Sequence, residues 1–467
     1  MNGDMISDDV IANHDDAQEP KPTAPQSTFR LLNRNFTWLW QGQAISQIGI
    51  QMFVIATIFW IKDLTGSATL MGLYQMLGAI PMIVLGAIGG AYADRHSRRR
   101  IIIMADLVRG LGTLALAIYA LARPEATGVV LTILLVLAIQ NSILAAFSGP
   151  ALQAAIPDLV PRERIATANS MAQLAFQLAI FIGQGVGGLL FRQLGAAIVF
   201  AINGSTYLYA AVSTSLVRIP PPSETLPAQG GGWRTALKRL GRDLMMSLKL
   251  VRDMSGLREM VILSALVTFF TIPIIFLLPF YVEDVLRVDA SWYGYMLAAH
   301  GVGALVGYGL AGSLATSGRL RGWLMMGFIV LQSLGFGVLG LIRRPDAATA
   351  LSVVGGLLTA FITVNITTIL QTTVDRELRG RVFGLLGSLS ASLAPLAMGL
   401  TGIVADLANQ NIPLIYGICG GAMVVPSLLV ISRPAFRSFV TQECVPFEGA
   451  PSTELETPLP LQTHVGR

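Results

Sequence analysis

Two charged side chains lie three residues apart in an apolar stretch, and they are the first place where this sequence could support chemistry. Asp106 and Arg109 are the only charged residues between positions 101 and 122. Residues three apart share one face of a helix and can pair, and charges inside a membrane helix are costly and usually partnered. We interpret them as a structural or gating pair, with proton carriage by Asp106 as the alternative.

His300 is the only histidine inside an apolar stretch. An unperturbed pKa of about 6.5 would suit proton coupling, while a hydrogen-bonded packing residue is the other interpretation. No residues have the spacing of metal ligands or of a nucleophile and its base, and no Gly-Lys-Ser phosphate loop occurs. The sequence therefore predicts no enzyme, no cofactor and no metal.

Uncharged amides offer a second kind of site. Gln43, Gln47 and Gln51 recur every four residues, which places them on one face of a helix. Neutral amides can bind a ligand or bond neighbouring helices, and both interpretations stay open. Further candidates for a substrate cavity are the amides Gln140, Asn141, Asn365 and Gln371.

The composition indicates that most of the chain lies in a membrane. Only 13% of its 467 residues are charged and the mean hydropathy is +0.63, whereas soluble domains carry about 25% charged residues. Several uncharged stretches are long enough to cross a bilayer as helices. We therefore predict an all-α integral membrane protein, and the net charge of +5 is not a nucleic-acid signal.

Twelve membrane helices are predicted from the apolar runs. They form two pseudo-symmetric halves of six, at 36–61, 69–93, 101–122, 128–150, 165–191 and 196–217, then at 259–282, 291–315, 322–342, 347–373, 382–406 and 412–432.

Positive charge predicts the orientation of these helices. Most of the 32 Lys and Arg residues fall in loops on one side, and Lys and Arg collect in cytoplasmic loops. Both termini are therefore expected in the cytoplasm. Six basic residues would lie on the other side: Lys62, Arg123, Arg192, Arg287, Arg343 and Arg344.

The chain divides into two halves flanked by polar segments. We predict a disordered tail at 1–28, the first half at 29–217, a cytoplasmic linker at 218–258, the second half at 259–436 and a disordered tail at 437–467. Residues 233–252 of the linker read as a basic amphipathic helix on the inner leaflet. Residues 312–321 repeat the spacing of 90–98, as in a transporter built from parallel repeats.

The basic loop between the second and third helices carries a family resemblance. Gly90-x-x-x-Asp94-Arg95-x-x-Arg98-Arg99 resembles the signature of the major facilitator superfamily. The bacterial branch with enterobactin exporters and macrolide efflux proteins is the most similar, and the resemblance covers roughly residues 30–436. The resemblance to this branch rests on segments 64–67, 105–109, 155–161, 168–169 and 379–383.

This resemblance implies a monomeric transporter in the bacterial cytoplasmic membrane. It would export a small amphipathic or apolar compound (a drug, a secondary metabolite or a siderophore) by alternating access, in exchange for protons. Uptake or uncoupled facilitation is an alternative, and a non-transporting receptor or scaffold is a more distant one.

Two departures from the family pattern bear on coupling. Ile50 stands where this branch often has an aspartate, and Gln184 stands where the antiporter-type motif has proline, within Gly183-Gln184-Gly-Val-Gly187-Gly188. Proton exchange is therefore implied by the resemblance alone.

Asp94 and Arg95 are expected to form a conformational latch, with Arg98 pairing nearby. If the eleventh membrane helix begins near Arg381, its N-terminal amides would attract the Asp94 carboxylate. The alternative is that these charges only fix the topology.

Overall fold

The computed structural model describes residues 33–123, 126–161, 164–220, 241–242, 245–246, 249, 251–313, 318–374 and 376–441. Both predicted tails lie largely or wholly outside these residues. Most of the predicted amphipathic helix at 233–252 and the centre of the repeat at 312–321 also lie outside them.

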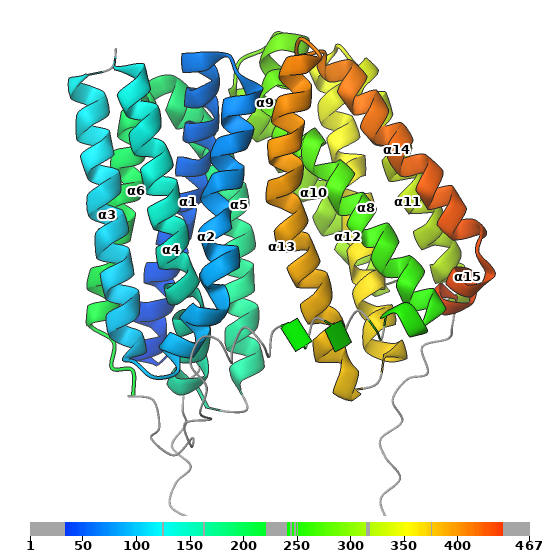
Figure 1. Cartoon of the computed structure of the whole chain (residues 1–467), viewed down its shortest axis with the longest axis horizontal. Helices are drawn as coiled ribbons and strands as arrows, with labels where there is room; N and C mark the ends of the chain where they lie inside the picture. Colours follow the sequence, from blue (N-terminus) through cyan, green and yellow to red (C-terminus); the bar gives the residue numbers. More distant parts are fainter. Residues whose placement is uncertain are drawn as a thin grey trace, which may run out of the picture.

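Helices make up nearly all of the described chain (Figure 1). The first half contains α1 (Arg34–Thr65), α2 (Ala68–Ala93), α3 (Arg98–Ala122), α4 (Thr127–Leu159), α5 (Ile165–Leu194) and α6 (Ala196–Ser215). The second contains α8 (Ser255–Phe276), α9 (Leu278–Phe280), the π-helical turn η2 (Tyr281–Val285), α10 (Ser291–Ser313), α11 (Gly318–Leu341), α12 (Pro345–Thr373), α13 (Arg376–Leu407), α14 (Ile412–Ser432) and the short α15 (Pro434–Val440).

Eleven helical segments of the described chain are long and apolar enough to cross a membrane. The 23-residue α10, which packs along α12, is the twelfth. The prediction of an all-α membrane protein with twelve helices in two halves of six is therefore confirmed.

The two halves repeat one packing pattern. In the first, α2 packs on α4, α3 on α6 and α1 on α5; in the second, α10 packs on α12, α11 on α14 and α8 on α13. Each packed pair in the second half corresponds to a packed pair in the first half whose two members come six membrane helices earlier in the chain. The halves stand side by side in Figure 1 and meet mainly where α2 packs on α13 and α5 on α10.

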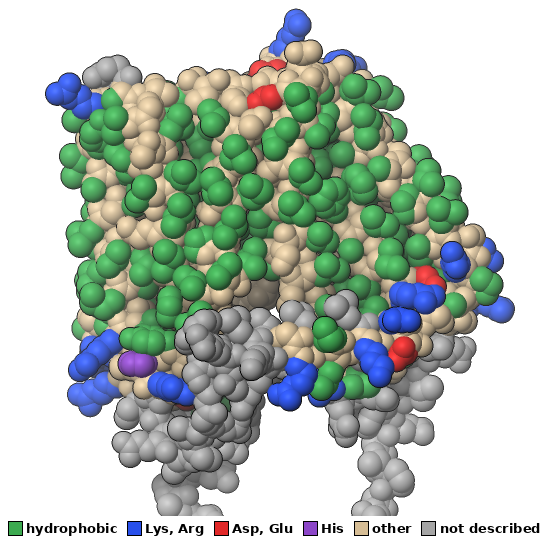
Figure 2. Space-filling view, in the orientation of Figure 1, with side chains coloured by type: hydrophobic (Ala, Val, Ile, Leu, Met, Phe, Trp, Pro, Cys, Tyr) green, Lys and Arg blue, Asp and Glu red, His purple; other side chains and the backbone are tan. Residues whose placement is uncertain are grey.

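The bundle has two distinct ends. The linker end, at the bottom of Figure 1, carries the start of α1, the loop between α2 and α3, and α15. The far end, at the top, carries the turn between α1 and α2, the turn η2 and the loop between α13 and α14. Figure 2 shows hydrophobic side chains over the flank, with Lys and Arg gathered at the ends.

Local sequence explains the sharp turn between α1 and α2. Gly66 ends α1 with a φ of 61°, in the left-handed region that favours glycine. Ser67 then caps α2, because its side chain accepts a hydrogen bond from the backbone N–H of Leu70. This turn places the start of α2 at the far end.

Several helix bounds differ from those predicted. α4 continues to Leu159 rather than ending at residue 150, although it contains Pro150 and Pro157. Arg98 of α3 holds these last turns, since it donates to the carbonyl oxygen of Ala154 and pairs with the Asp158 carboxylate. α13 begins at Arg376 rather than near 382.

Candidate functional site

A buried charged centre lies inside the first half. The Asp106 and Arg109 side chains of α3 pair at 3.7 Å between Oδ1 and Nη1. Gln43 of α1 donates from Nε2 to Asp106 Oδ2 at 3.1 Å. Asp106 is 2% exposed and Arg109 is 8% exposed. Because Asp106 follows the start of α3 by two turns, the pair lies about 12 Å from the linker end.

The guanidinium of Arg109 also connects α3 with two further helices. Its Nη2 donates to Ser148 Oγ at 3.1 Å and to the backbone oxygen of Asn141 at 3.3 Å, both in α4. Tyr207 of α6 lies with its ring centre 5.8 Å from the guanidinium carbon. Four helices therefore surround one buried cation and its carboxylate, and removing either charge would leave the other buried and unpaired.

The glutamine face of α1 bonds neighbouring helices. Gln43 contacts Asp106, and Gln51 Oε1 accepts a hydrogen bond from Gln184 Nε2 of α5 at 2.9 Å. Gln47 is half-buried. Gln184, the residue that replaces the expected proline, thus contributes a bond between α5 and α1.

The other predicted amides are scattered. Gln140 donates to the backbone oxygen of Val108, and Asn365 donates to Phe361 within its own helix. Gln371 is exposed near the linker end. Asn141 has a buried Oδ1 with no hydrogen-bond partner among the described residues. The structure therefore does not gather these four amides into one site.

The glycine motif of α5 allows close contact with α1. A Cβ on Gly183 would lie 2.7 Å from the backbone oxygen of Ile48, and one on Gly187 would lie 2.8 Å from Met52 Cα. Side chains at these positions would force α1 away from α5. The small residues therefore serve the packing within the first half.

The same motif also faces the second half. A Cβ built on Gly294 of α10 would lie 2.9 Å from the backbone oxygen of Gly185, and one on Gly188 would lie 3.6 Å from that of Ala290. α5 therefore contacts α1 through one face and α10 through another.

The basic loop lies at the linker end. Asp94 and Arg95 are exposed, and the position of Gly90 has room for a Cβ. Arg98 pairs with Asp158, and Arg99 donates to the backbone oxygen of Ser215, so both stay within the first half. Contact between Asp94 and the start of α13 remains a prediction for another conformation.

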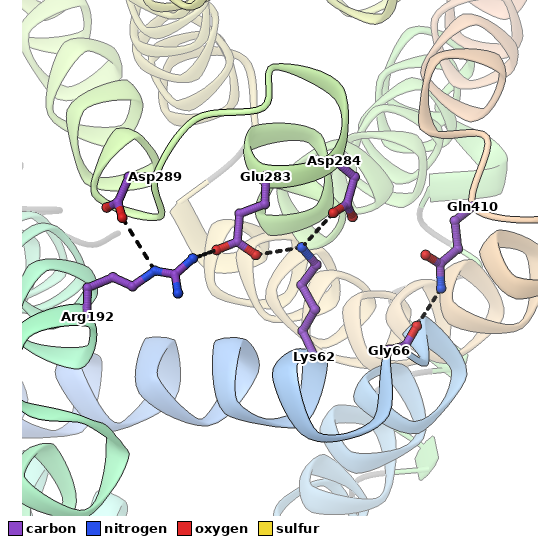
Figure 3. Close-up of polar contacts among 7 residues, drawn as sticks. All are labelled: Lys62, Gly66, Arg192, Glu283, Asp284, Asp289 and Gln410. Atoms are coloured by element: carbon purple, nitrogen blue, oxygen red, sulfur yellow. Dashed lines mark hydrogen bonds and ion pairs between the residues drawn. The ribbon is translucent and has the colours of Figure 1, made fainter.

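Ion pairs cross between the halves at the far end (Figure 3). Lys62 Nζ of α1 lies 2.6 Å from Glu283 Oε2 and 3.2 Å from Asp284 Oδ1, both on η2. Arg192 of α5 lies 2.5 Å from Glu283 Oε1 and 3.6 Å from Asp289 Oδ2. We call these five residues the far-end charge cluster. Glu283 is its centre, because one carboxylate holds two cations of the opposite half.

A second contact at this end caps a helix across the halves. Asp406 of α13 accepts hydrogen bonds from Ser67 Oγ at 2.7 Å and from the backbone N–H groups of Ala68 at 3.0 Å and Thr69 at 2.9 Å. A carboxylate at a helix N-terminus satisfies free N–H groups and is favoured by the helix dipole. Gln410 adds a bond to the Gly66 carbonyl, visible in Figure 3.

Within the described residues, all ion pairs between the halves lie at the far end. The halves are therefore held together there, while the charged loop around Asp94 at the linker end is exposed.

The far-end contacts are not predicted from the sequence, in which Lys62 and Arg192 stand out only as basic residues on the outer side. A usable signal was present, because the helix order places four acidic residues at this same end: Glu283, Asp284, Asp289 and Asp406. Basic and acidic residues in loops on the same side of the membrane can form ion pairs between the two halves.

His300 lies apart from the charged centre. It is half-buried on α10, the helix that packs along α12 in the second half.

Comparison with known proteins places these features in a family. A family model described as the Major Facilitator Superfamily matches residues 39–399. Macrolide efflux protein A of Streptococcus pyogenes is 27% identical over 380 residues, which cover 80% of this chain and 90% of that protein. The multidrug efflux pump Tap of Mycolicibacterium fortuitum is 26% identical over 385 residues, covering 81% and 89%.

Further similarity is found with an exporter and with solved structures. Enterobactin exporter EntS of Shigella boydii is 27% identical over 78% of this chain and 86% of that protein. A bacterial homologue of the lysosomal transporter Spinster has a TM-score of 0.61 at 15% identity, covering 87% of this chain and 96% of its own. A D-xylose-proton symporter has a TM-score of 0.62 at 16% identity, covering 85% and 97%.

Proposed function

We propose, from the premise that this chain belongs to the Major Facilitator Superfamily, that it exports a small amphipathic or apolar compound in exchange for protons. The chain is a multi-pass membrane transporter and not an enzyme. Export, the substrate class and the use of protons are the proposal.

The observation that carries the proposal is the pairing of the two halves at one end. The far-end charge cluster and the Asp406 cap join the halves there, while Asp94 is exposed at the other end. Alternating access requires contacts that form at one end and break as the other end closes. We assign the linker end to the cytoplasm, so that this conformation is the one open to the inside.

The direction and the substrate class are supported by the relatives. Macrolide efflux protein A, Tap and EntS are named for efflux or export. Between the helix ends, few fixed charges are present to bind a strongly anionic compound. A small, largely neutral amphipathic molecule fits this interior best.

Asp106 is the carboxylate that we assign to proton exchange. In the described structure it pairs with Arg109 and accepts from Gln43. A proton on Asp106 would neutralise it and weaken its hold on Arg109, whose other hydrogen-bond partners are in α4. Proton binding would thereby change the contacts between α3 and α4.

An efflux assay tests this proposal. Cells with and without the protein are loaded with a macrolide, a neutral dye or a siderophore, and efflux is followed before and after a protonophore is added. We expect faster efflux of at least one compound with the protein, and loss of that difference with the protonophore. Faster accumulation would instead show uptake, and efflux that ignores the protonophore would show uncoupled facilitation.

A matched pair of variants tests the role of Asp106. Asp106→Asn retains an acceptor for Gln43 but cannot carry a proton, so efflux should no longer respond to an imposed pH gradient. Asp346→Asn is the control, because Asp346 is exposed and pairs with its neighbour Arg344. A normal pH response in Asp106→Asn would reject this assignment.

A further inference from the structure

A cavity of about 730 Å³ lies within the second half. Its walls come mainly from α8, α10, α11 and α12, and no described residue of the first half lines it. α8 packs on α13, α14 and α15, and the cavity separates it from α10, α11 and α12. Because transporters built from repeats carry their substrate between the repeats, a cavity inside one half is a separate site.

The cavity opens on the outer flank of α11. Leu331, Leu334 and Val338 line the cavity and are 48%, 49% and 48% exposed, and their spacing of three and four residues places them on one helix face. α11 packs on α12, α14 and α15, on the side of the second half that is turned away from the first half (Figure 1). The exposed face of α11 therefore lies against the bilayer and not in the space between the halves.

This opening lies at the depth of the hydrocarbon core. α11 begins at the linker end with Gly318 and crosses the membrane. Leu331 follows Gly318 at a distance of about 20 Å along the helix, and Leu334 at about 24 Å. At this depth the surroundings of a membrane protein are lipid tails without water. A lipid tail is thus the molecule with direct access to the opening.

The lining suits a hydrocarbon occupant. It contains no Asp, Glu, Lys or Arg among the described residues, and most of its side chains are aliphatic. Several of its polar groups already bond within the protein. Gln332 Nε2 of α11 donates to Thr359 Oγ1 of α12 at 2.7 Å, while Thr359, Ser352 and Thr363 donate to backbone oxygens of α12. His300, a candidate from the sequence, also lines the cavity.

The length of the cavity also fits a lipid tail. Its lining on α12 extends from Leu351 to Ile366, which is about 22 Å along the helix. A tail that fills one leaflet spans about 15 Å, half of the hydrocarbon core. An apolar cavity does not hold water, and an empty one forfeits dispersion contacts along its walls. A tail from the bilayer would restore those contacts.

We propose that this cavity holds one hydrocarbon tail of a membrane phospholipid, which enters sideways from the bilayer beside α11. The tail fills the space between α8 and the opposite helices and so completes the packing of the second half. This inference depends on the membrane location of the chain, and it holds whether or not the protein exports a compound.

A glycine on the wall allows the cavity to be filled without disturbing the helices. A Cβ on Gly355 would meet only His300 Nδ1, at 3.8 Å, so Gly355→Leu projects into the cavity. Gly309 of α10 is exposed, lines no part of the cavity and has open space around it. Gly309→Leu is therefore the matched control in the same half.

The test places the full chain in lipid nanodiscs that contain phosphatidylglycerol with a diazirine in the middle of one tail. Illumination attaches this tail to the residues it contacts, and mass spectrometry of peptides locates them. We expect labels at Thr268 of α8 and Ser352 of α12, which line the cavity. Ile118 of α3 is 67% exposed on the flank and serves as the reference for bulk lipid.

The two glycine variants decide whether the label reports the cavity. Gly355→Leu should lower the labelling of Thr268 and Ser352 by about tenfold, because the new side chain and the tail compete for one space. Labelling of Ile118 should not change, and Gly309→Leu should behave as the wild type. Removal of lipid by detergent should lower the melting temperature of the wild type more than that of Gly355→Leu, whose own side chain occupies part of the cavity.

Four outcomes would overturn the inference. They are labels confined to the exposed flank of the folded wild type, equal labelling of the cavity in Gly355→Leu and the wild type, and equal losses in Gly355→Leu and Gly309→Leu. The fourth is native mass spectrometry in which Gly355→Leu loses a bound compound that is not a lipid.

Discussion

The corresponding interiors of the two halves differ in what occupies them. Between α1, α3 and α4, the first half holds the Asp106 and Arg109 pair with Gln43. Between α8, α11 and α12, which occupy the same places six membrane helices later, the second half holds a neutral cavity. One packing pattern thus supports a charged, filled centre in one half and a hollow, uncharged one in the other.

The far end repeats this division of charge. The first half supplies the cations Lys62 and Arg192, and the second supplies Glu283, Asp284 and Asp289. Because these paired side chains carry opposite charge, they attract each other across the boundary. The comparison shows that the halves share a backbone arrangement but differ in the charge of their interiors.

The strongest test of this comparison removes one charge from the filled centre. Asp106→Ala leaves Arg109 buried without its carboxylate, so we expect a loss of about 3–5 kcal/mol in stability. Gln332→Ala in the hollow centre removes one neutral hydrogen bond and should cost about 1 kcal/mol. Thermal unfolding of both purified variants measures the difference, and equal losses would contradict a division between the halves.

A second test adds volume to each half. Gly183→Ala forces a Cβ against the backbone of α1, so we expect a loss of about 1–3 kcal/mol. Gly355→Ala places a Cβ in open cavity space and should leave stability unchanged or raise it by about 0.5–1 kcal/mol. Melting temperatures in one detergent compare the two. A larger loss for Gly355→Ala would show that the second half is as tightly packed as the first.

A third test weakens the contact between the halves. Asp406→Ala removes the cap on α2. This loss should destabilise the conformation in which the halves are joined at the far end by about 0.5–2 kcal/mol. Spin labels at Leu70 and Leu407, both exposed at the far end, would report longer distances as the open population grows. The native cysteines are replaced by serine for this measurement.

Asn411→Ala is the control for the cap. Asn411 caps α14 within the second half, since its side chain accepts from the backbone N–H of Leu414. Its loss should leave the distances between the halves unchanged. Similar distance shifts in both variants would mean that Asp406 acts only on local helix stability.

The smallest effect on stability is expected at the linker end. Asp94 is exposed, so Asp94→Asn should not change the melting temperature. If Asp94 contacts the start of α13 when this end closes, the same variant should slow efflux several-fold while leaving binding of the exported compound intact. Normal efflux in Asp94→Asn would reject the latch and leave the loop as a topology signal.

The helices were predictable because the membrane imposes a simple rule. Uncharged runs bounded by charges and glycines mark the spans, and residue spacing alone placed Asp106 beside Arg109. Bounds failed where tertiary contacts extend a helix, as Arg98 does at the end of α4.

The site was less predictable, because its parts come together only in three dimensions. Gln43 and Gln51 looked alike in sequence, yet one bonds a carboxylate and the other an amide on a different helix. The cavity had no signature, since its apolar lining is indistinguishable from ordinary membrane helix. Glu283 lies far in sequence from both of its cationic partners.

The far-end charge cluster has a shielded centre and an open rim, which bears on how the protein responds to the salinity of its surroundings. The Lys62 and Glu283 side chains are only 9% and 12% exposed, while those of Asp284 and Asp289 are 50% and 56% exposed. Dissolved ions screen exposed pairs much more than buried ones. Brackish or saline media would therefore loosen the rim and leave the central pair intact, so the halves stay joined over a wide range of ionic strength.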